Sequence, residues 1–446
     1  MASTYLTKTF SGAGNRKKWT WSAWVKKSQE SSSNTYNQSL FGTAGSGYDT
    51  ISFLTTPNNP KFFCAIDGGF ERQTNALFRD CNGWYHLVIT FDSAQSTASD
   101  RLKMYVNGVQ QSSFSTNTNG SQNTDSHINN TDAHQIGKQQ TLSRYFDGLM
   151  SHIHFCDGYA YAASDFGSTD STTGEWKINT SPSVSYGTNG FFILKDGNSL
   201  TDQSPNSNNW SLGGGTLTKT EDNPSNVFAT LNPLASLPNT GASTFTNGNT
   251  TSQGTNGSYV NGGSTLMMSS GKFYAEMKYV ATSSASRCWV GITEDVSEIS
   301  RINQDVGSYN VIYRSQTGGL NIEGGGENSY GATFTTGDIM GIALDLDNNR
   351  LFFSKNGTWQ NSGDPTSSTG AITTFTAPAS TLNGGWFFAS GSDSNAQNNT
   401  VSWNFGNGYF GTTAVSSAGT NASGNGIFEY DVPAGYTALS TKGLNL

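Results

Sequence analysis

Few of the reactive side chains in this 446-residue chain are spaced for catalysis. Retaining glycoside hydrolysis needs two carboxyl groups about 5–5.5 Å apart, which on a strand means residues two or four positions apart. Glu429 and Asp431 have this spacing, but they lie beside Pro433, in a tail outside the segments expected to form a core. The sequence has no Gly-x-Ser-x-Gly pattern, zinc-type His/Cys spacing or phosphate-binding glycine loop. We therefore expect a binding protein, not an enzyme.

Two groups of residues have the chemistry to bind a metal ion. His152 and His154 are two positions apart, so a strand would point both imidazoles to one face. The alternative is that both are half-exposed polar residues opposite Ile153 and Phe155. Calcium takes carboxylate, amide and backbone oxygens at loop ends, and its candidate ligands are Asp49, Asp67, Asp125 and Asp147. Asp is also frequent in turns, where it bonds its own backbone, so turn formation is the alternative role.

The composition is well suited to carbohydrate binding. Sugar faces stack on aromatic rings, while amides and hydroxyls bond sugar hydroxyls without the desolvation cost of a buried charge. The candidate residues outside predicted strand interiors are Tyr309, Tyr313, Arg314, Tyr330 and Trp359. Each of these side chains could instead cover an edge of the core.

Charge and hydropathy exclude several function classes. The net charge of −8 disfavours binding to a phosphate backbone, which needs a concentrated basic surface. No run of about 18 apolar residues is present, so we expect no membrane insertion, and the first ten residues do not resemble a secretion signal. The four cysteines are scattered and few for the length, so we expect reduced packing thiols in a protein made in a cytoplasm.

Short alternating runs bounded by Gly, Asn, Ser and Asp recur along the whole chain, which predicts an all-β fold. In residues 19–25 and 84–91 every second residue is apolar. A third run, 102–106, ends at Asn107-Gly108, a strong signal for a tight hairpin. Residues 146–155 could close this first sandwich, and residues 160–226 are expected to add strands and loops to it.

The alternation returns in the second half of the chain. Residues 273–280, 288–292 and 339–346 are predicted strands, and reversals at 347–349 and 356–357 predict consecutive hairpins. Residues 235–263 are nearly all small and polar, and are either a linker or a long loop of the second domain. We predict two antiparallel β-sandwich (jelly-roll) domains in series, at residues 1–221 and 222–410, and a C-terminal tail at 411–446.

Both halves resemble known domain families. Residues 84–92, with 102–108 and Tyr145-Phe146-Asp147-Gly148, resemble the laminin-G-like, concanavalin A-like jelly roll. Residues 337–347, 351–357 and Val401-Ser402-Trp403-Asn404-Phe405-Gly406 resemble the central hairpin and last strand of a SPRY domain. These resemblances imply two lectin-like sandwiches, and calcium is the usual ion of the first family.

The pairing of these domains, with an opening at residues 13–20 and a close at 433–439, is similar to structural proteins of marine tailed bacteriophages. The resemblance implies a tail-fibre or appendage-type protein on the virion surface, assembled in the host cytoplasm and released by lysis. Its expected partners are other virion proteins, host cell-surface polysaccharide and further copies of itself, most simply in a homotrimer. The alternatives are a purely structural decoration or connector protein and, third, a polysaccharide depolymerase.

Overall fold

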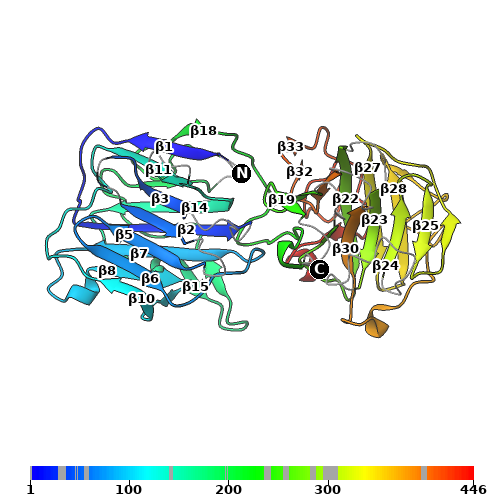
Figure 1. The fold of residues 1–446 in the computed structure, drawn as a ribbon, viewed down its shortest axis with the longest axis horizontal. Coiled ribbons are helices and arrows are strands. Elements are labelled where there is room, and N and C mark those ends of the chain that lie inside the picture. The colour runs from blue at the N-terminus through cyan, green and yellow to red at the C-terminus, as the bar shows by residue number, and fades with distance from the viewer. Residues whose placement is uncertain are drawn as a thin grey trace. The chain divides into compact units, whose positions relative to one another are not determined.

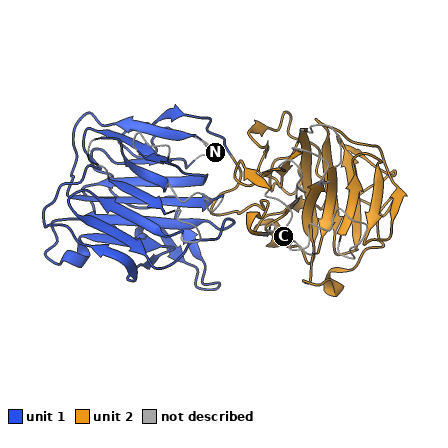
Figure 2. Ribbon diagram, viewed as in Figure 1, with its two compact units in different colours: residues 1–219 blue, residues 220–446 orange. Residues whose placement is uncertain are grey.

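A computed structural model describes residues 3–28, 37–45, 47, 49–54, 60–139, 144–195, 197, 199–235, 243–254, 261–281, 288–294, 310–392 and 399–445. The described chain is all-β apart from short 3-10 turns, and it forms two compact units, residues 1–219 and 220–446 (Figures 1 and 2). Among the described residues, no helix has the length and apolar character needed to span a bilayer.

Unit 1 is a sandwich of two antiparallel sheets. The six-stranded sheet has the order β17 (Phe191–Ile193), β14 (Gly148–Asp157), β2 (Lys18–Lys27), β7 (Tyr85–Asp92), β8 (Leu102–Val106) and β9 (Val109–Gln110). The eight-stranded sheet has the order β10 (Phe114–Thr118), β6 (Phe70–Thr74), β5 (Phe62–Ile66), β4 (Thr50–Phe53), β3 (Gln38–Thr43), β11 (Ala133–Ile136), β1 (Tyr5–Thr9) and β18 (Ser211–Gly214).

The alternating runs of the sequence form the core between these sheets. Trp19, Trp21, Ala23 and Val25 of β2 are fully buried in it, and β7 and β8 contribute every second residue. The predicted turn at Asn107-Gly108 joins β8 to β9, and both residues have the positive φ that such hairpins require. Strands β17 and β18 confirm that residues after 160 complete the first sandwich.

Two short hairpins lie outside the main sheets of unit 1. They are β12 (Lys138–Gln139) with β13 (Arg144–Tyr145), and β15 (Gly167–Thr169) with β16 (Trp176–Ile178). The second hairpin belongs to a segment that covers the outer face of the six-stranded sheet, where Ala163 and Phe166 pack on Val88 and Tyr105.

Unit 2 is a second antiparallel sandwich. One sheet has the order β19 (Thr244–Thr246), β20 (Thr251–Gln253), β31 (Thr400–Asn404), β22 (Lys272–Ala281), β27 (Ile339–Asp345), β28 (Arg350–Lys355) and β29 (Thr358–Trp359), with β34 (Thr437–Ala438) parallel to β22. The other has the order β21 (Asn261–Gly263), β30 (Phe387–Ser392), β23 (Cys288–Thr293), β24 (Asn310–Arg314), β25 (Gly319–Ile322) and β26 (Glu327–Ser329). Because β19, β20 and β21 join these sheets, the described residues 243–254 and 261–263 belong to the second domain and not to a linker between domains.

The C-terminal residues are part of unit 2 and not a separate tail. Phe428, Val432 and Tyr436 pack on Tyr274 and Phe352 in a buried cluster on the outer face of the β22–β28 sheet. The small hairpin β32 (Tyr409–Phe410) with β33 (Thr413–Ala414) precedes this segment. The sequence pattern did not predict that this C-terminal segment covers the sheet, because its apolar residues are separated by turns and do not alternate.

A buried carboxylate fixes the C-terminal cover. Glu276 of β22 accepts hydrogen bonds from the backbone N–H groups of Glu429 at 2.9 Å and Tyr430 at 2.8 Å, and from the Tyr274 hydroxyl at 3.1 Å. Burial raises the pKa of Glu276 to about 7, although these donors act in the opposite direction. The acid therefore joins the last segment of the chain to the central strand of the sheet.

The four cysteines are buried and none is in a disulfide, as expected of packing thiols. Burial raises the pKa of the Cys64, Cys156 and Cys288 thiols, which keeps them protonated and unreactive.

Candidate functional site

The outer face of the eight-stranded sheet of unit 1 carries uncharged polar side chains at its centre. On β4, Ile51 and Phe53 point into the core, so Thr50 and Ser52 point outwards. The register of β11, β3, β5 and β6 against β4 extends this into two rows, one of Gln135, Gly42, Thr50, Ala65 and Glu71, the other of Ser39, Ser52, Phe63 and Gln73. We call these two rows the polar face.

Four oxygens of the polar face are buried and make no hydrogen bond in the described part of the chain; they belong to Ser39, Thr50, Ser52 and Gln135. An unpaired buried polar atom costs roughly 1–3 kcal/mol, because the group has lost its water and gained no partner. These four lie on three neighbouring strands, so they form one group of unsatisfied oxygens. Ser39, Thr50 and Ser52 are 0% exposed, so a ligand rich in hydroxyls could satisfy them only if the atoms that cover them moved aside.

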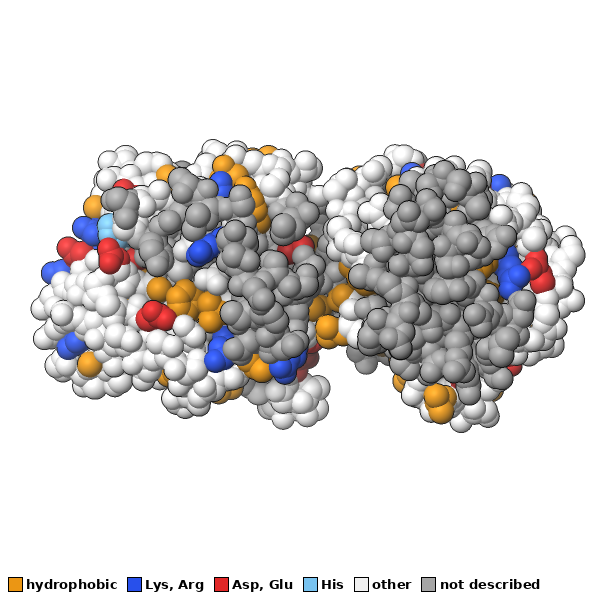
Figure 3. Space-filling view, in the orientation of Figure 1, with side chains coloured by type: hydrophobic (Ala, Val, Ile, Leu, Met, Phe, Trp, Pro, Cys, Tyr) orange, Lys and Arg blue, Asp and Glu red, His pale blue; other side chains and the backbone are white. Residues whose placement is uncertain are grey.

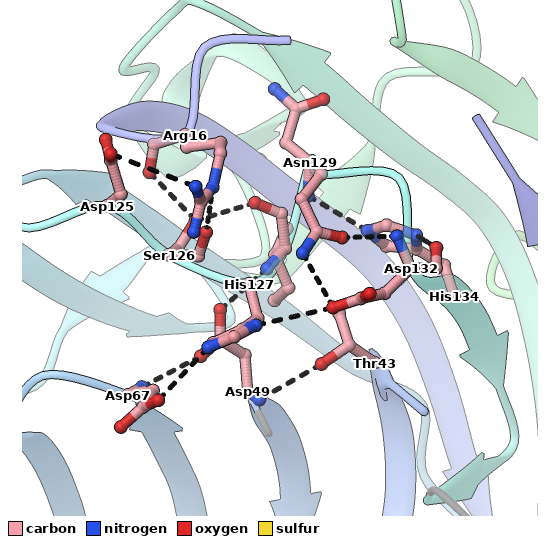
Figure 4. A network of polar contacts seen from close by, with 12 residues as sticks. Arg16, Thr43, Asp49, Asp67, Asp125, Ser126, His127, Asn129, Asp132 and His134 are labelled. Atoms are coloured by element: carbon pink, nitrogen blue, oxygen red, sulfur yellow. Dashed lines mark hydrogen bonds and ion pairs between the residues drawn. The ribbon is translucent and has the colours of Figure 1, made fainter. Parts of the chain in front are cut away.

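A polar loop cluster borders the polar face where β3 turns into β4 (Figure 4). Its centre is Asp49, a buried carboxylate that accepts the backbone N–H groups of Ile128 at 2.7 Å and Asp67 at 2.8 Å. Its own N–H donates to the Thr43 hydroxyl at 3.3 Å. Burial raises the pKa of Asp49 to about 6, although its backbone donors act in the opposite direction. Asp49 thus joins three loops that are distant in sequence.

His127 lies between two carboxylates in this loop cluster. Its Nε2 is 3.1 Å from Asp67 Oδ2 and its Nδ1 is 3.4 Å from Asp132 Oδ2. The Asn130 amide, 2.6 Å from Asp132, and then the His127 ring hold the pKa of Asp132 below its usual value. The side chains of Asp67 and Asp132 are 57% and 34% exposed, so these carboxylates can accept hydrogen bonds from a ligand at the rim of the face.

His134 holds the same loop through hydrogen bonds to its backbone. Its Nε2 accepts the Asn129 backbone N–H at 2.9 Å, so its Nδ1 carries the proton and donates to the Asp132 carbonyl oxygen, also at 2.9 Å. Burial lowers the pKa of His134 to about 4, which keeps the ring neutral. This ring has a structural role.

The structure does not bring the four predicted calcium ligands together. Both carboxylate oxygens of Asp49 accept backbone N–H groups, and Asp125 faces Arg16 at 3.9 Å. Asp147 precedes Gly148, which pairs with Lys27 at one end of β2, whereas Asp125 lies at the other end. Among the described residues, no three His, Cys, Asp or Glu side chains are placed to hold a metal ion. In the described chain Asp49 and Asp125 have partners within the protein, and the four residues do not form one group.

Four of the five predicted carbohydrate-binding residues of unit 2 have structural contacts in the fold. Tyr313 is fully buried and its hydroxyl donates to the Ala332 carbonyl oxygen, so it offers no stacking face. Tyr330 packs edge-on against it, and Arg314 forms an ion pair with Glu327 at 2.7 Å. Trp359 packs against the buried C-terminal cluster. Tyr309 lies outside the described residues.

The two remaining sequence patterns also have structural roles. His154 is buried, stacks on Phe192 with ring centroids 3.9 Å apart, and shares a hydrogen bond with the Tyr186 hydroxyl, so its ring does not face a metal site. A bulge between Ser151 and His154 interrupts the simple alternation that the pattern assumed. The carboxylates of Glu429 and Asp431 bond Ser416 and Thr420 respectively, and the segment that carries them covers the second sandwich.

Sequence reasoning missed the polar face because Ser and Thr in strands are common and only pairing between strands gathers them. The available signal was the alternation in residues 50–53, where Thr and Ser alternate with Ile and Phe. That pattern indicates a polar outer side but not that β3 and β11 extend it.

Comparisons with known proteins agree with the two sandwiches. Residues 3–164 match the family model of the concanavalin A-like lectin/glucanases superfamily, and residues 272–407 match that of the SPRY domain. The chain therefore carries a concanavalin A-like domain followed by a SPRY domain, at the positions where the sequence resembles them.

One curated relative, the Ran-binding proteins 9/10 homolog of Drosophila melanogaster, is 31% identical over 90 residues, which are 20% of this chain and 9% of that protein. This chain thus spans a small part of that relative's length.

Three solved structures match parts of this chain at low identity and low TM-score. A human SPRY domain is 17% identical, with 34% of this chain and 90% of that chain covered and a TM-score of 0.26. Domain 4 of the extracellular arabinanase AbnA of Geobacillus stearothermophilus, in complex with arabinotriose, is 19% identical, with coverage of 33% and 64% and a TM-score of 0.25. The pentraxin of Limulus polyphemus is 12% identical, with coverage of 48% and 91% and a TM-score of 0.30.

Proposed function

We propose that the chain binds uncharged, hydroxyl-rich carbohydrate through the polar face of unit 1, without cleaving it. The observation that carries this proposal is the group of four buried oxygens without hydrogen-bond partners on Ser39, Thr50, Ser52 and Gln135. Sugar hydroxyls both donate and accept, so they can pair with such oxygens once the atoms that cover this face move aside, and they carry no charge to be desolvated. The lectin-like family of this domain supports the same chemistry.

The charge distribution supports a neutral ligand. Residues 1–219 contain sixteen Lys and Arg and sixteen Asp and Glu, so the formal charge of unit 1 is zero. Unit 2 contains eight Lys and Arg and sixteen Asp and Glu, so it carries the whole formal charge of −8. In Figure 3 the visible described surface of unit 1 is mostly uncharged, and it carries both acidic and basic side chains. Long-range steering of a charged polysaccharide towards unit 1 is therefore weak.

Two substitutions test the polar face because they separate binding from stability. Thr50→Val and Ser52→Ala each remove an unpaired hydroxyl, so we expect unit 1 to unfold at equal or higher urea concentration than the unchanged protein. We expect the same variants to bind a neutral glucan such as laminarin at least about tenfold more weakly, since each loses a hydrogen bond worth about 1.4 kcal/mol or more to a polar ligand. Affinity electrophoresis in laminarin gels and urea denaturation measure the two effects.

The matched control is Thr43→Val on β3. It removes the acceptor of the Asp49 N–H group, so it lowers stability and leaves the rows of the polar face unchanged. If the Thr50→Val and Ser52→Ala variants are retained in laminarin gels as strongly as the unchanged protein, the polar face is not the binding site. Release of reducing ends from laminarin during the assay would show a depolymerase, and absence of retention for laminarin, dextran and agarose oligosaccharides would favour a structural role.

We further propose that the protein is a surface component of a tailed-phage particle, where it contacts host polysaccharide. The support is the similarity of its paired domains and terminal segments to structural proteins of marine tailed phages. Antibody labelling of virions followed by electron microscopy tests this, and label inside the particle or none on it would contradict it. We propose a homotrimer because several weak sites on one particle add avidity, and multi-angle light scattering of the full chain would refute it by showing a monomer.

A further inference from the structure

The segment that covers the outer face of the six-stranded sheet of unit 1 is anchored firmly at its beginning. The Thr20 hydroxyl donates to the Tyr159 carbonyl oxygen and accepts the Tyr161 N–H, both at 2.8 Å. The Thr90 hydroxyl donates to the Tyr161 carbonyl oxygen. Phe166 then packs among the buried side chains on the sheet. Residues 159–166 are therefore fixed to β2 and β7.

The β15–β16 hairpin that follows is mostly exposed, and Trp176 provides its contact with the sheet. The Trp176 ring stacks on His86 with centroids 5.9 Å apart and an interplanar angle of 17°. The His86 ring also stacks on Trp24, at 4.9 Å and 22°. Gly108 leaves room for the Trp176 ring, because a Cβ atom at this position would lie 2.4 Å from it.

Hydrogen bonds fix the protonation state of His86. The Trp176 indole can only donate, and its Nε1 is 3.0 Å from His86 Nδ1, so Nδ1 is the acceptor. The proton is on Nε2, which donates to the Ser22 hydroxyl at 2.9 Å. This arrangement is the reverse of a catalytic Ser–His pair, in which Nδ1–H donates to an acceptor that stabilises the imidazolium. A second proton on the ring would sit on Nδ1. The Nδ1–H and the Trp176 Nε1–H would then point at each other, and the hydrogen bond to Trp176 would break.

The surroundings of His86 do not stabilise an imidazolium. The titratable groups in this layer are His154 and Cys156 on β14, Tyr105 on β8, Tyr161, Asp165 and Tyr186 in the covering segment, and Asp170, Glu175 and Lys177 of the hairpin. No hydrogen bond or ion pair joins any of them to His86 in the described chain, and the Asp165 carboxylate instead accepts the Ala162 N–H at 2.9 Å. Burial lowers the pKa of His86 to about 3.

We propose that the β15–β16 hairpin is an acid-released cover, held on the sheet by neutral His86 and freed when this ring is protonated. Release exposes the stacked rings of Trp24, His86 and Trp176, while residues 159–166 remain anchored. With an ordinary pKa of 6.5 in the released state, His86 shifts the ratio of docked to released hairpin by about 30-fold between pH 8 and pH 5.

Hydrogen–deuterium exchange of the full chain, corrected for the intrinsic pH dependence of exchange, tests this cover. We expect protection of residues 167–178 to fall by about 30-fold from pH 8 to pH 5, while β2, β7 and β14 stay protected. His86→Asn keeps an acceptor near the position of Nδ1 but does not titrate, so its hairpin should be equally protected at both pH values.

Gly108→Ala is a second variant that does not depend on His86. Its added methyl group displaces the Trp176 ring, so the hairpin should exchange rapidly at pH 8 and change little at pH 5. His134→Gln is the matched control, since it removes another buried neutral histidine far from the hairpin and should retain the acid release. Equal protection of 167–178 at both pH values in the unchanged protein, loss of protection only together with β7, or acid release that persists in His86→Asn would each overturn the proposal.

Discussion

The two units should respond to acid in opposite directions. Burial keeps His86, His134 and His154 of unit 1 neutral by lowering the pKa of each ring. In unit 2 burial raises the pKa of the Glu276 carboxyl. A lowered histidine pKa gives stability that is present above the unfolded value of 6.5 and lost as the pH falls. A raised glutamate pKa gives stability that is present below the unfolded value of 4.5 and lost as the pH rises through about 7.

The size of the effect in unit 1 follows from the pKa differences. At pH 5 the unfolded chain protonates His86 and His134, whose folded pKa values are about 3 and about 4. This costs about 2 kcal/mol of stability for each ring relative to pH 8, as long as the β15–β16 hairpin stays docked on His86. Asp49 has a raised pKa of about 6, so its protonation in the folded state stabilises unit 1 by about 1.5 kcal/mol and offsets part of this loss. The net loss is about 2.5 kcal/mol, and His154 adds to it in the same direction.

In unit 2 the same shift in pH acts through Glu276. With a folded pKa of about 7 and an unfolded value of 4.5, this carboxyl adds about 2.5 kcal/mol of stability between pH 8 and pH 5. For domains of this size, about 1 kcal/mol corresponds to a shift of about 2–4 °C in melting temperature. The melting temperature of unit 1 should therefore fall by about 5–10 °C while that of unit 2 rises by a similar amount.

Differential scanning calorimetry of the full chain at pH 8 and pH 5 measures both transitions, and hydrogen–deuterium exchange during heating assigns each to its unit. Glu276→Gln should remove most of the acid stabilisation of unit 2 and leave unit 1 unchanged. Two transitions that move in the same direction, or an acid-stabilised unit 2 in the Glu276→Gln variant, would refute the reasoning.

Three further predictions follow from particular contacts. Gly14→Ala should destabilise unit 1 by about 1–3 kcal/mol in urea denaturation, because its Cβ would lie 2.5 Å from Asn129 Oδ1 and 2.6 Å from Asp157 Oδ2; an unchanged midpoint would contradict this packing. Deletion of residues 427–446 should remove more than about 5 kcal/mol from unit 2, since Phe428, Val432 and Tyr436 are buried there, and its calorimetric transition should disappear. Laminarin binding should change little between 50 mM and 500 mM NaCl because unit 1 has no net charge, and a strong decrease with salt in affinity electrophoresis would indicate charged contacts.

The sequence alone determined the fold class and the order of the domains. The side-chain period of a strand is two residues, so runs such as 19–25 and 339–346 identify a buried face without knowledge of their partners. The tight turns at Asn107-Gly108 and Asn356-Gly357 were predictable for a similar reason, because few residues other than Asn and Gly adopt positive φ at both positions.

Only the tertiary structure decided which residues meet. The polar face depends on the register of β11, β3, β4, β5 and β6, which no local pattern encodes. The stacking partners of His86 are distant in sequence, and Trp176 is 90 residues away. Tyr313 and Asp49 were good candidates by residue type, but burial gave them structural roles. Residue type sets what a side chain can do, whereas its neighbours, brought together by long-range strand pairing, determine which of those roles is energetically available.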